Sequence, residues 1–196
     1  VPWDRIATVY ARNGVQVSSF PVIHIINGAV GYRLDYNGRS VVFSGDTRPC
    51  HPLVDACDGA DLLVHETFPS APVFAQKAGV PLGFAEQVVN GAHTSPTAAG
   101  RVFAHAGARM SVMWHLAVDH QVVGPAYADM RTQYDGPVTI AQDLTTFDIS
   151  AEAIVTRQSS IAPAAWPVLG PTEVTGPPMS LPPEPPAWWA GALLTD

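Results

Sequence analysis

Residues 39–47 read Arg-Ser-Val-Val-Phe-Ser-Gly-Asp-Thr, an apolar run that ends in a glycine-containing turn. The run predicts a buried strand, and the turn would place the carboxylate of Asp46 between the hydroxyls of Ser44 and Thr47. An acid that follows a strand most often only caps a turn, so Asp46 alone is weak support for a site. Its meaning depends on the residues that come after it.

Three more polar groups follow Asp46, each at the end of a strand-like run or just before the start of a helix. They are His65-Glu66, His93-Thr94-Ser95 and His115. Imidazole and carboxylate groups that meet at element ends can bind metals or transfer protons. The four groups together predict a metal or acid–base centre rather than scattered polar residues.

The pattern around these groups predicts an α/β body. Asn37-Gly38 separates two apolar runs, 31–36 and 39–44, and is a strong hairpin signal. Ser95 and Pro96 fit the N-cap and first position of a helix over 95–107. The other expected strands are 15–20, 61–65, 109–114, 138–141 and 144–149, and the other expected helices are 51–57, 70–79, 84–91 and 122–134, with a last turn at 151–155.

Composition limits the kinds of partner. The 196 residues are 47% hydrophobic and 14% charged, enough for one domain with a core, and no apolar stretch is long enough to span a membrane. The net charge is −7, with Lys77 as the single lysine, and no basic stripe is visible. This argues against a nucleic-acid partner and favours a small uncharged or weakly anionic substrate. The first four residues show no signal peptide.

The character of the chain changes near its end. Residues 1–158 form the predicted body, and residues 159–196 are predicted to be a proline-rich extended tail. Trp188-Trp189 could anchor this tail either on the body or on another subunit, which leaves a homo-oligomer open. Cys50 and Cys57 are best interpreted as two buried thiols, because a helix between them would hold them too far apart for a disulfide.

The ordered set of motifs resembles a known family. Ser44-Gly45-Asp46-Thr47, then His65-Glu66-Thr67, His93-Thr94-Ser95 and Trp114-His115-Leu116 look like the C-terminal half of a metallo-β-lactamase-fold hydrolase. The similar branch contains ribonuclease Z and arylsulfatase-type enzymes. The resemblance covers about residues 15–150, and it implies half of an αββα sandwich, with a mixed sheet and helices on its outer face.

The resemblance implies a role for each motif. Asp46 would bridge two zinc or other divalent ions, and His115 would be a ligand of the second ion. A hydroxide between the two ions would attack the ester, as in other two-metal sites. His93 would be the general acid for the leaving group, and Glu66, bonded to its other ring nitrogen, would fix its tautomer.

Further residues are expected around this centre. His24 is either a fixed histidine near the site that binds substrate or a plain strand residue. Phe74 and Phe84 would give an apolar, substrate-binding lining to a loop or lid over 68–84. His65 fits a structural hydrogen-bonding residue better than a ligand.

The sequence departs from the family in one large respect. The family has a His-x-His-x-Asp-His metal motif in its N-terminal half, and no such run occurs in these 196 residues, where His24 is the only histidine before Asp46. Half of a sandwich would also expose one apolar face of its sheet. We therefore expect an N-terminal segment or partner chain that carries the missing ligands.

Three functions are compatible with the sequence. The first is a zinc-dependent hydrolase of a small ester, such as a phosphodiester, a sulfate ester, a lactone or another carboxylic ester. The second is a ribonuclease Z-like endonuclease that processes the 3′ end of transfer RNA. The third is a non-catalytic module with a vestigial metal site.

Overall fold

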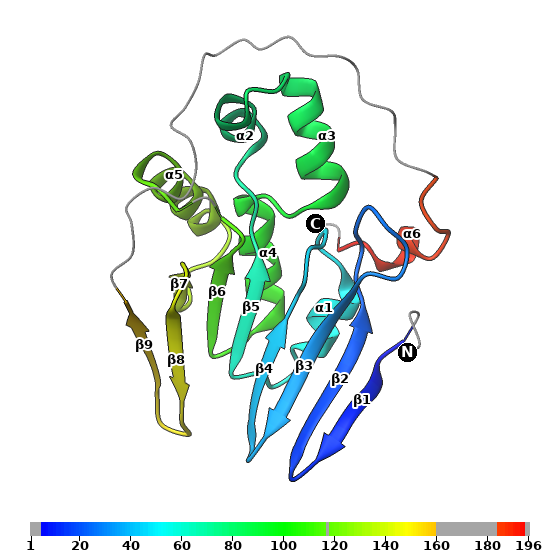
Figure 1. Ribbon diagram of the computed structural model, residues 1–196, viewed down its shortest axis with the longest axis vertical. Helices are drawn as coiled ribbons and strands as arrows, with labels where there is room; N and C mark the ends of the chain where they lie inside the picture. Colours follow the sequence, from blue (N-terminus) through cyan, green and yellow to red (C-terminus); the bar gives the residue numbers. More distant parts are fainter. Residues whose placement is uncertain (1–4, 117, 160–183, 195–196) are drawn as a thin grey trace.

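The computed structural model describes residues 5–116, 118–159 and 184–194, which form a mixed sheet with helices against it (Figure 1). Seven strands lie side by side in the order of the chain, and a separate two-stranded hairpin follows them. The strands are β1 (Ala7–Arg12), β2 (Val15–Pro21), β3 (Val30–Tyr36), β4 (Arg39–Phe43), β5 (Leu62–Glu66), β6 (Met110–Trp114), β7 (Val138–Ile140), β8 (Thr145–Ile149) and β9 (Ile154–Gln158). The helices are α1 (His51–Ala56), α2 (Ala71–Ala78), α3 (Leu82–Ala92), α4 (Pro96–Ala106), α5 (His120–Arg131) and α6 (Trp189–Ala192).

Strands β1 to β4 form an antiparallel half built from consecutive connections. Asn37 and Gly38 have φ values of 49° and 67°, which suits the tight β3–β4 hairpin that their sequence predicts. Asn13 and Gly14 turn the chain between β1 and β2 in the same way, with φ values of 53° and 77°. Strand β1 was not expected from the sequence, because it is an edge strand whose residues are mostly exposed and lack an apolar alternation.

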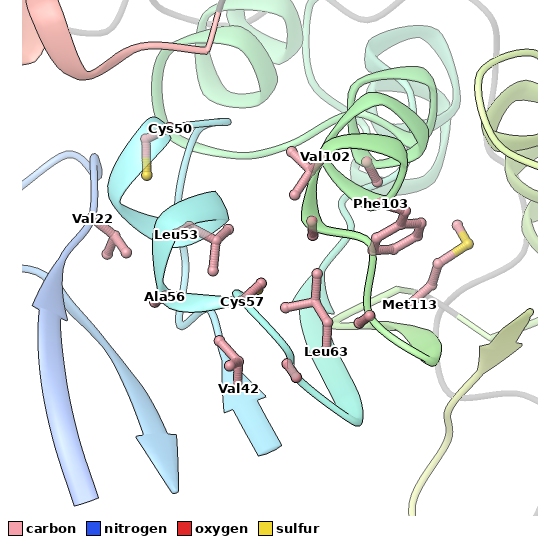
Figure 2. Close-up of a cluster of buried hydrophobic side chains, with 14 of the residues drawn as sticks. Val22, Val42, Cys50, Leu53, Ala56, Cys57, Leu63, Val102, Phe103 and Met113 are labelled. Carbon is pink, nitrogen blue, oxygen red and sulfur yellow. The ribbon is translucent and has the colours of Figure 1, made fainter. Parts of the chain in front are cut away.

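Strands β4 to β7 form a parallel half, and helices connect them. Helices α1 and α4 pack on one face of the sheet, where Val42, Leu63 and Met113 meet Leu53 and Phe103 in the core (Figure 2). Helices α2 and α3 stand beyond the ends of β5 and β6 (Figure 1). The expected mixed sheet with helices on its outer face is confirmed.

The other face of the sheet is apolar and partly open. Tyr32 lies opposite Phe43 in the β3–β4 register, and 44% and 43% of their surfaces are exposed, with Trp114 on β6 at 40%. Side chains alternate between the two faces of a strand, so these rings point away from the face that carries Val42 and Met113. Large aromatic groups rarely remain uncovered in such a row. This is the kind of exposed face expected for half of a sandwich.

The end of the body differs from the prediction in one element. Residues 151–155 were expected to form a turn, but β9 begins at Ile154 and pairs antiparallel with β8. Ser150 and Ala153 close the turn between the strands through a backbone hydrogen bond of 2.9 Å. The predicted turn is therefore present at 151–153, but β9 was missed, because its pairing depends on β8 and leaves no pattern of its own.

Part of the predicted tail lies outside the described residues, namely 160–183 and 195–196. The described part, 184–194, returns to the body: Trp189 is buried in the core cluster, and the Leu194 amide donates to the Pro49 carbonyl at 3.2 Å. Of the two anchors considered for Trp188-Trp189, the body is therefore the one observed. No helix in the described part of the chain combines the length and apolar character that a membrane span requires.

The two cysteines are buried and free. Burial raises the pKa of the Cys57 thiol to about 12, and burial likewise raises the pKa of Cys50. Both side chains therefore act as small core residues at neutral pH.

Candidate metal centre

The polar groups predicted from the sequence converge at one edge of the sheet. Asp46 follows β4, Glu66 ends β5 and His115 follows β6, so the three come from the carboxyl ends of adjacent parallel strands. His93 joins them from the junction between α3 and α4. Parallel strands bring such ends together at a single edge, which is where open α/β sheets place their sites.

The turn that carries Asp46 is held from both sides. The Ser44 hydroxyl accepts a hydrogen bond from the Glu66 amide at 2.9 Å, and the Thr47 amide donates to Glu66 Oε1 at 2.9 Å. Gly45 has a φ of 63°, and a Cβ there would lie 3.0 Å from the Val30 carbonyl oxygen. A side chain at position 45 would therefore strain the turn. These contacts hold the backbone of the turn that carries Asp46.

His93 and Glu66 form a buried pair. His93 Nδ1 lies 3.0 Å from Glu66 Oε1, and Glu66 is fully buried. Burial raises the pKa of Glu66, while the hydrogen bond with His93 and the Thr47 amide act to lower it. The Glu66 carboxylate can accept a hydrogen bond from Nδ1 only when Nδ1 carries a proton. Nε2 is therefore the His93 nitrogen that faces the site.

The neighbouring loop fixes the backbone of this pair. Thr94 Oγ1 donates to the Thr47 carbonyl at 2.6 Å, which ties the His93 segment to the Asp46 turn. Ser95 then caps α4 by accepting from the Ala98 amide, as its position before Pro96 predicts.

Asp46, His93 and His115 could hold a divalent ion together. Each offers one ligand atom, and these atoms all lie within 4.8 Å of one another. His115 Nε2 is 4.0 Å from Asp46 Oδ2. This distance is within the separation of about 4.4 Å that two ligands of one zinc ion can have. These donors are therefore of the types that a zinc ion takes, and the Asp46–His115 distance allows a shared ion, while a complete coordination shell needs further ligands.

Two observations indicate that this edge is not an ordinary surface. His115 adopts a φ of 62°, a conformation that is uncommon for residues other than glycine and often occurs at functional sites. Glu66 Oε2 is buried and has no hydrogen-bond partner among the described residues. An unpaired buried carboxylate oxygen is costly, so a water, an ion or a ligand is expected to meet it.

A buried aromatic ring lies under the imidazoles. Phe68 stacks on His93 with ring centroids 4.4 Å apart and an interplanar angle of 13°, and its centroid is 5.5 Å from that of His115. Sequence analysis missed Phe68 as a site residue. The signal that could have found it is its position directly after His65-Glu66-Thr67 at the end of β5.

Comparison with known proteins agrees with this arrangement. The chain is 38% identical over 113 residues to "Ribonuclease Z" of Myxococcus xanthus, covering 57% of this chain and 33% of that protein. It is 34% identical over 147 residues to "Ribonuclease Z" of Mycobacterium avium, covering 73% of this chain and 50% of that protein. The chain thus spans between a third and a half of the length of these curated relatives. The chain therefore has part of the metallo-β-lactamase fold and is similar in sequence to ribonuclease Z.

A solved structure supports the fold of this chain independently. The metallo-β-lactamase-fold protein YhfI from Bacillus subtilis superposes with a TM-score of 0.54 and 20% identity, covering 72% of this chain and 52% of that chain. No protein-family model matches the sequence. The fold class expected from the motifs is therefore confirmed for a partial domain.

The remaining predicted residues of the chain lie at different distances from the centre. His24 hydrogen-bonds through Nδ1 to the Ala92 carbonyl at 2.8 Å, and its ring lies edge-on to His93 at 5.1 Å. The Phe74 ring lies 4.9 Å from that of Phe68, which puts it one ring away from His93. Phe84 is half-buried in α3, and among the described residues no ring contact joins it to this group.

His65 behaves as a buried structural residue. It is fully buried against Phe103, with Nδ1 in contact with the Glu66 carbonyl. Burial lowers the pKa of His65 to about 4, so its ring is neutral at pH 7. Its side chain packs into the core rather than toward the three donors, which supports the structural role over that of a ligand.

Proposed function

We propose that this chain contributes to a metal-dependent phosphodiesterase of the ribonuclease Z type, with the 3′ end of a transfer RNA as its candidate substrate. The observation that carries the proposal is the contact between His93 and the buried Glu66. It leaves one imidazole nitrogen beside Asp46 and His115, where a general acid would stand next to metal ligands. The two relatives named Ribonuclease Z support the reaction type.

The proposed chemistry assigns one task to each residue. Asp46 and His115 would be ligands of divalent ions, which we take to be two zinc ions. When bound, such ions supply Lewis-acid activation of a water and of the ester. His93 gives a proton from Nε2 to the leaving oxygen, and Glu66 holds the Nδ1 proton in place. Phe68 covers one face of the His93 ring and excludes water from it.

This order of substrates reverses the one derived from composition. The sequence alone favoured a small ester and argued against nucleic acid, because the net charge is −7. The relatives now favour RNA. The small ester remains as a second candidate because the described residues show no lysine-rich surface: Lys77 is buried and pairs with Asp119. His24 and Phe74 stay proposed as substrate-contacting residues in either case.

The open sheet face supports a missing partner for the site. In this proposal the chain contributes two metal ligands, Asp46 and His115, and a two-metal centre needs more ligands than that. We propose that an N-terminal segment or a second chain bearing a His-x-His-x-Asp-His motif packs on the face that exposes Tyr32, Phe43 and Trp114. Any basic surface for RNA would then belong mainly to that partner.

Metal analysis of the intact protein tests the proposal first. We expect about two zinc ions per protomer and cleavage of an RNA with a 3′ extension that stops when a chelator removes the metal. An intact, folded protein that contains no metal and cleaves neither RNA nor bis(p-nitrophenyl) phosphate would instead support the vestigial module.

The variant His93→Ala then separates the acid from the ligands. It should retain the metal content and lower turnover by about 10²–10⁴-fold, as expected for removal of a general acid. The matched variant His105→Ala changes an exposed histidine on α4 and should keep both metal and turnover. Loss of metal from His93→Ala would show that His93 is a ligand and not the acid.

A further inference from the structure

A buried ion pair joins two helices, α2 and α5. The ammonium group of Lys77, on the last turn of α2, pairs with the carboxylate of Asp119, the N-cap of α5. The Lys77 side chain has no exposed surface, and that of Asp119 is 7% exposed. Lysine is almost never fully buried without a charged partner, so this pair determines where the single lysine of the chain can lie.

Both oxygens of the Asp119 carboxylate have partners. Oδ1 accepts from the Gln121 and Val122 amides at 2.8 and 3.1 Å and so caps α5, while Oδ2 meets Lys77. Burial acts to raise the pKa of Asp119, but the hydrogen bonds from Lys77 and from these amides bring it below its ordinary value. The carboxylate is therefore ionised at neutral pH, and it links the two helices as a charged pair.

Such a pair is better suited to orientation than to stability. Removing two charges from water costs about as much free energy as their attraction returns, so apolar residues of similar volume often stabilise a fold as well. Charged hydrogen bonds, however, have a preferred distance and direction. The pair is therefore expected to fix where α2 lies against the start of α5.

Helix α2 reaches the two site imidazoles through aromatic rings. Phe74 lies three positions before Lys77, which places both residues on one side of α2. The Phe74 ring contacts that of Phe68, with centroids 4.9 Å apart. Phe68 in turn stacks on His93 at 4.4 Å and lies 5.5 Å from His115. A displacement of α2 would therefore reach both imidazoles through direct ring contacts.

The other partner of the pair is linked to His115 along the chain. Asp119 lies four positions after His115, at the start of the helix that follows β6. On the other side of His115, the Thr67 amide donates to the Trp114 carbonyl at 2.8 Å. The uncommon backbone conformation of His115, with a φ of 62°, thus occurs between two anchored positions.

We infer that Lys77 and Asp119 are positioning residues of the candidate metal centre. Their ion pair holds α2 and the start of α5 in the arrangement that keeps the rings of His93 and His115 in place. This inference rests on the proposed function for the roles of the two histidines. Neither Lys77 nor Asp119 contacts the metal or the substrate, and each acts through the histidines alone.

Two variants remove the ion pair to different degrees. The double variant Lys77→Met/Asp119→Asn leaves no unpaired buried charge, since methionine keeps the apolar stem of the lysine and asparagine still caps α5. The milder variant Lys77→Gln removes the charge but can still donate a hydrogen bond to Asp119. It takes the place of the double variant if that protein does not fold.

NMR of the intact protein before zinc is added tests the positions of the rings. The Cε1–Hε1 signals of His93 and His115, identified by their loss in the corresponding alanine variants, should shift in the double variant, because the ring of Phe68 no longer lies at the same distance from them. Lys77→Gln should give smaller shifts in the same direction. The signal of His105, exposed on α4, should stay in place. Unmoved His93 and His115 signals in a folded variant would overturn the inference.

Zinc affinity provides the functional readout. In competition with a chelator, the double variant should bind zinc about 10-fold more weakly than wild type, as expected when a group that orients a metal ligand is lost. Excess zinc should restore its turnover, which it would not do after a general loss of folding. Unchanged zinc affinity in the double variant would overturn the inference.

The matched control removes a buried, ion-paired carboxylate far from the rings. Asp61→Asn breaks the pairs with Arg39 and Arg109 and should lower stability, but it should leave the histidine signals and the zinc affinity at their wild-type values. Equal effects in Asp61→Asn and in the double variant would mean that the Lys77–Asp119 pair is only structural. If the wild-type protein binds no zinc, the proposed function fails, and the NMR signals still decide whether the pair positions the imidazoles.

Discussion

Two aspartates lie at opposite ends of the parallel strands, and they differ in the number of hydrogen-bond and ion-pair partners that the protein gives them. Asp61, just before β5, is buried and accepts from the Ser40 amide at 2.8 Å and from Arg109 at 2.6 Å, with Arg39 at 3.3 Å. Asp46, after β4, is half-buried, and the ion-pair contact it has among the described residues is His115 at 4.0 Å.

The difference extends to the energetics of the two carboxylates. Burial alone would raise the pKa of Asp61, but hydrogen bonds from Arg109 and the Ser40 amide and the charge of Arg39 bring it below its ordinary value. Asp61 is thus stabilised as an anion by the protein itself. Asp46 keeps lone pairs that the described residues do not use, which is the state that a metal ligand needs before the metal binds. The comparison shows that the carboxylate with a structural role has its oxygens occupied by hydrogen bonds, whereas the carboxylate of the candidate site does not.

The largest expected effect follows from removing the negative charge of Asp46. Asp46→Asn should reduce turnover by about 10³-fold or more, equivalent to about 4 kcal/mol, because a proposed metal ligand is lost. Without added metal, its free energy of unfolding should stay within about 0.5 kcal/mol of wild type, since Asp46 makes no close ion pair to lose. Metal content and urea denaturation of the same samples measure the two effects. Retention of both metal ions would show that Asp46 is not such a ligand.

The second effect concerns His65, a buried residue of β5 that packs against Phe103 in the core. Its folded-state pKa is about 4, compared with about 6.5 in the unfolded chain, so the unfolded state binds more protons between these values. Its contribution to stability is therefore complete above pH 6.5 and is lost as the pH falls toward 4, by about 3 kcal/mol. Urea denaturation from pH 7 to pH 4 measures this loss.

A variant isolates the His65 contribution. His65→Leu cannot titrate, so the dependence of unfolding free energy on pH in this range should become shallower by about that amount, whatever its absolute stability. His105→Gln, at an exposed position on α4, should keep the wild-type slope. An unchanged slope in His65→Leu would contradict the assignment.

The third effect tests Asp61, whose carboxylate is hydrogen-bonded by the protein itself. Asp61→Asn should lower the free energy of unfolding by about 2–3 kcal/mol, because it removes charged hydrogen bonds from a buried group while its partners, 36% exposed, regain water. Its metal content should remain that of wild type. The matched variant Asp148→Asn breaks the exposed pair with Arg157 and should cost less than about 1 kcal/mol. Loss of metal from Asp61→Asn would contradict the assignment of Asp61 as a purely structural residue.

The smallest effect concerns the residue that positions His93. Glu66→Gln keeps the shape of the side chain and should lower turnover by about 10–100-fold while the metal content is maintained. The alkaline limb of the pH–rate profile should move to lower pH, because an amide stabilises the imidazolium less than a carboxylate does. A lower turnover with an unmoved limb would mean that Glu66 acts only as packing.

The features predicted correctly from the sequence are those set by close neighbours along the chain. Asn37-Gly38 closes its hairpin because both residues tolerate a positive φ, and Ser95-Pro96 starts α4 because the cap and the proline act within one turn. Strand β1 and strand β9 were missed, because their pairing depends on partners and not on an internal pattern. Phe68 was missed for the same reason.

The sequence by itself determined the order of the motifs, the ends of the main elements and the resemblance to the metallo-β-lactamase fold, because each depends on residues within a few positions of one another. Only the tertiary structure decided which polar groups are satisfied. Glu66 and His93 are 27 positions apart, and Asp61 and Arg109 are 48 apart, yet their contacts are what separates a site from a structural cluster. Hydrogen bonding and desolvation depend on what surrounds an atom in space, and the folded chain alone supplies those surroundings.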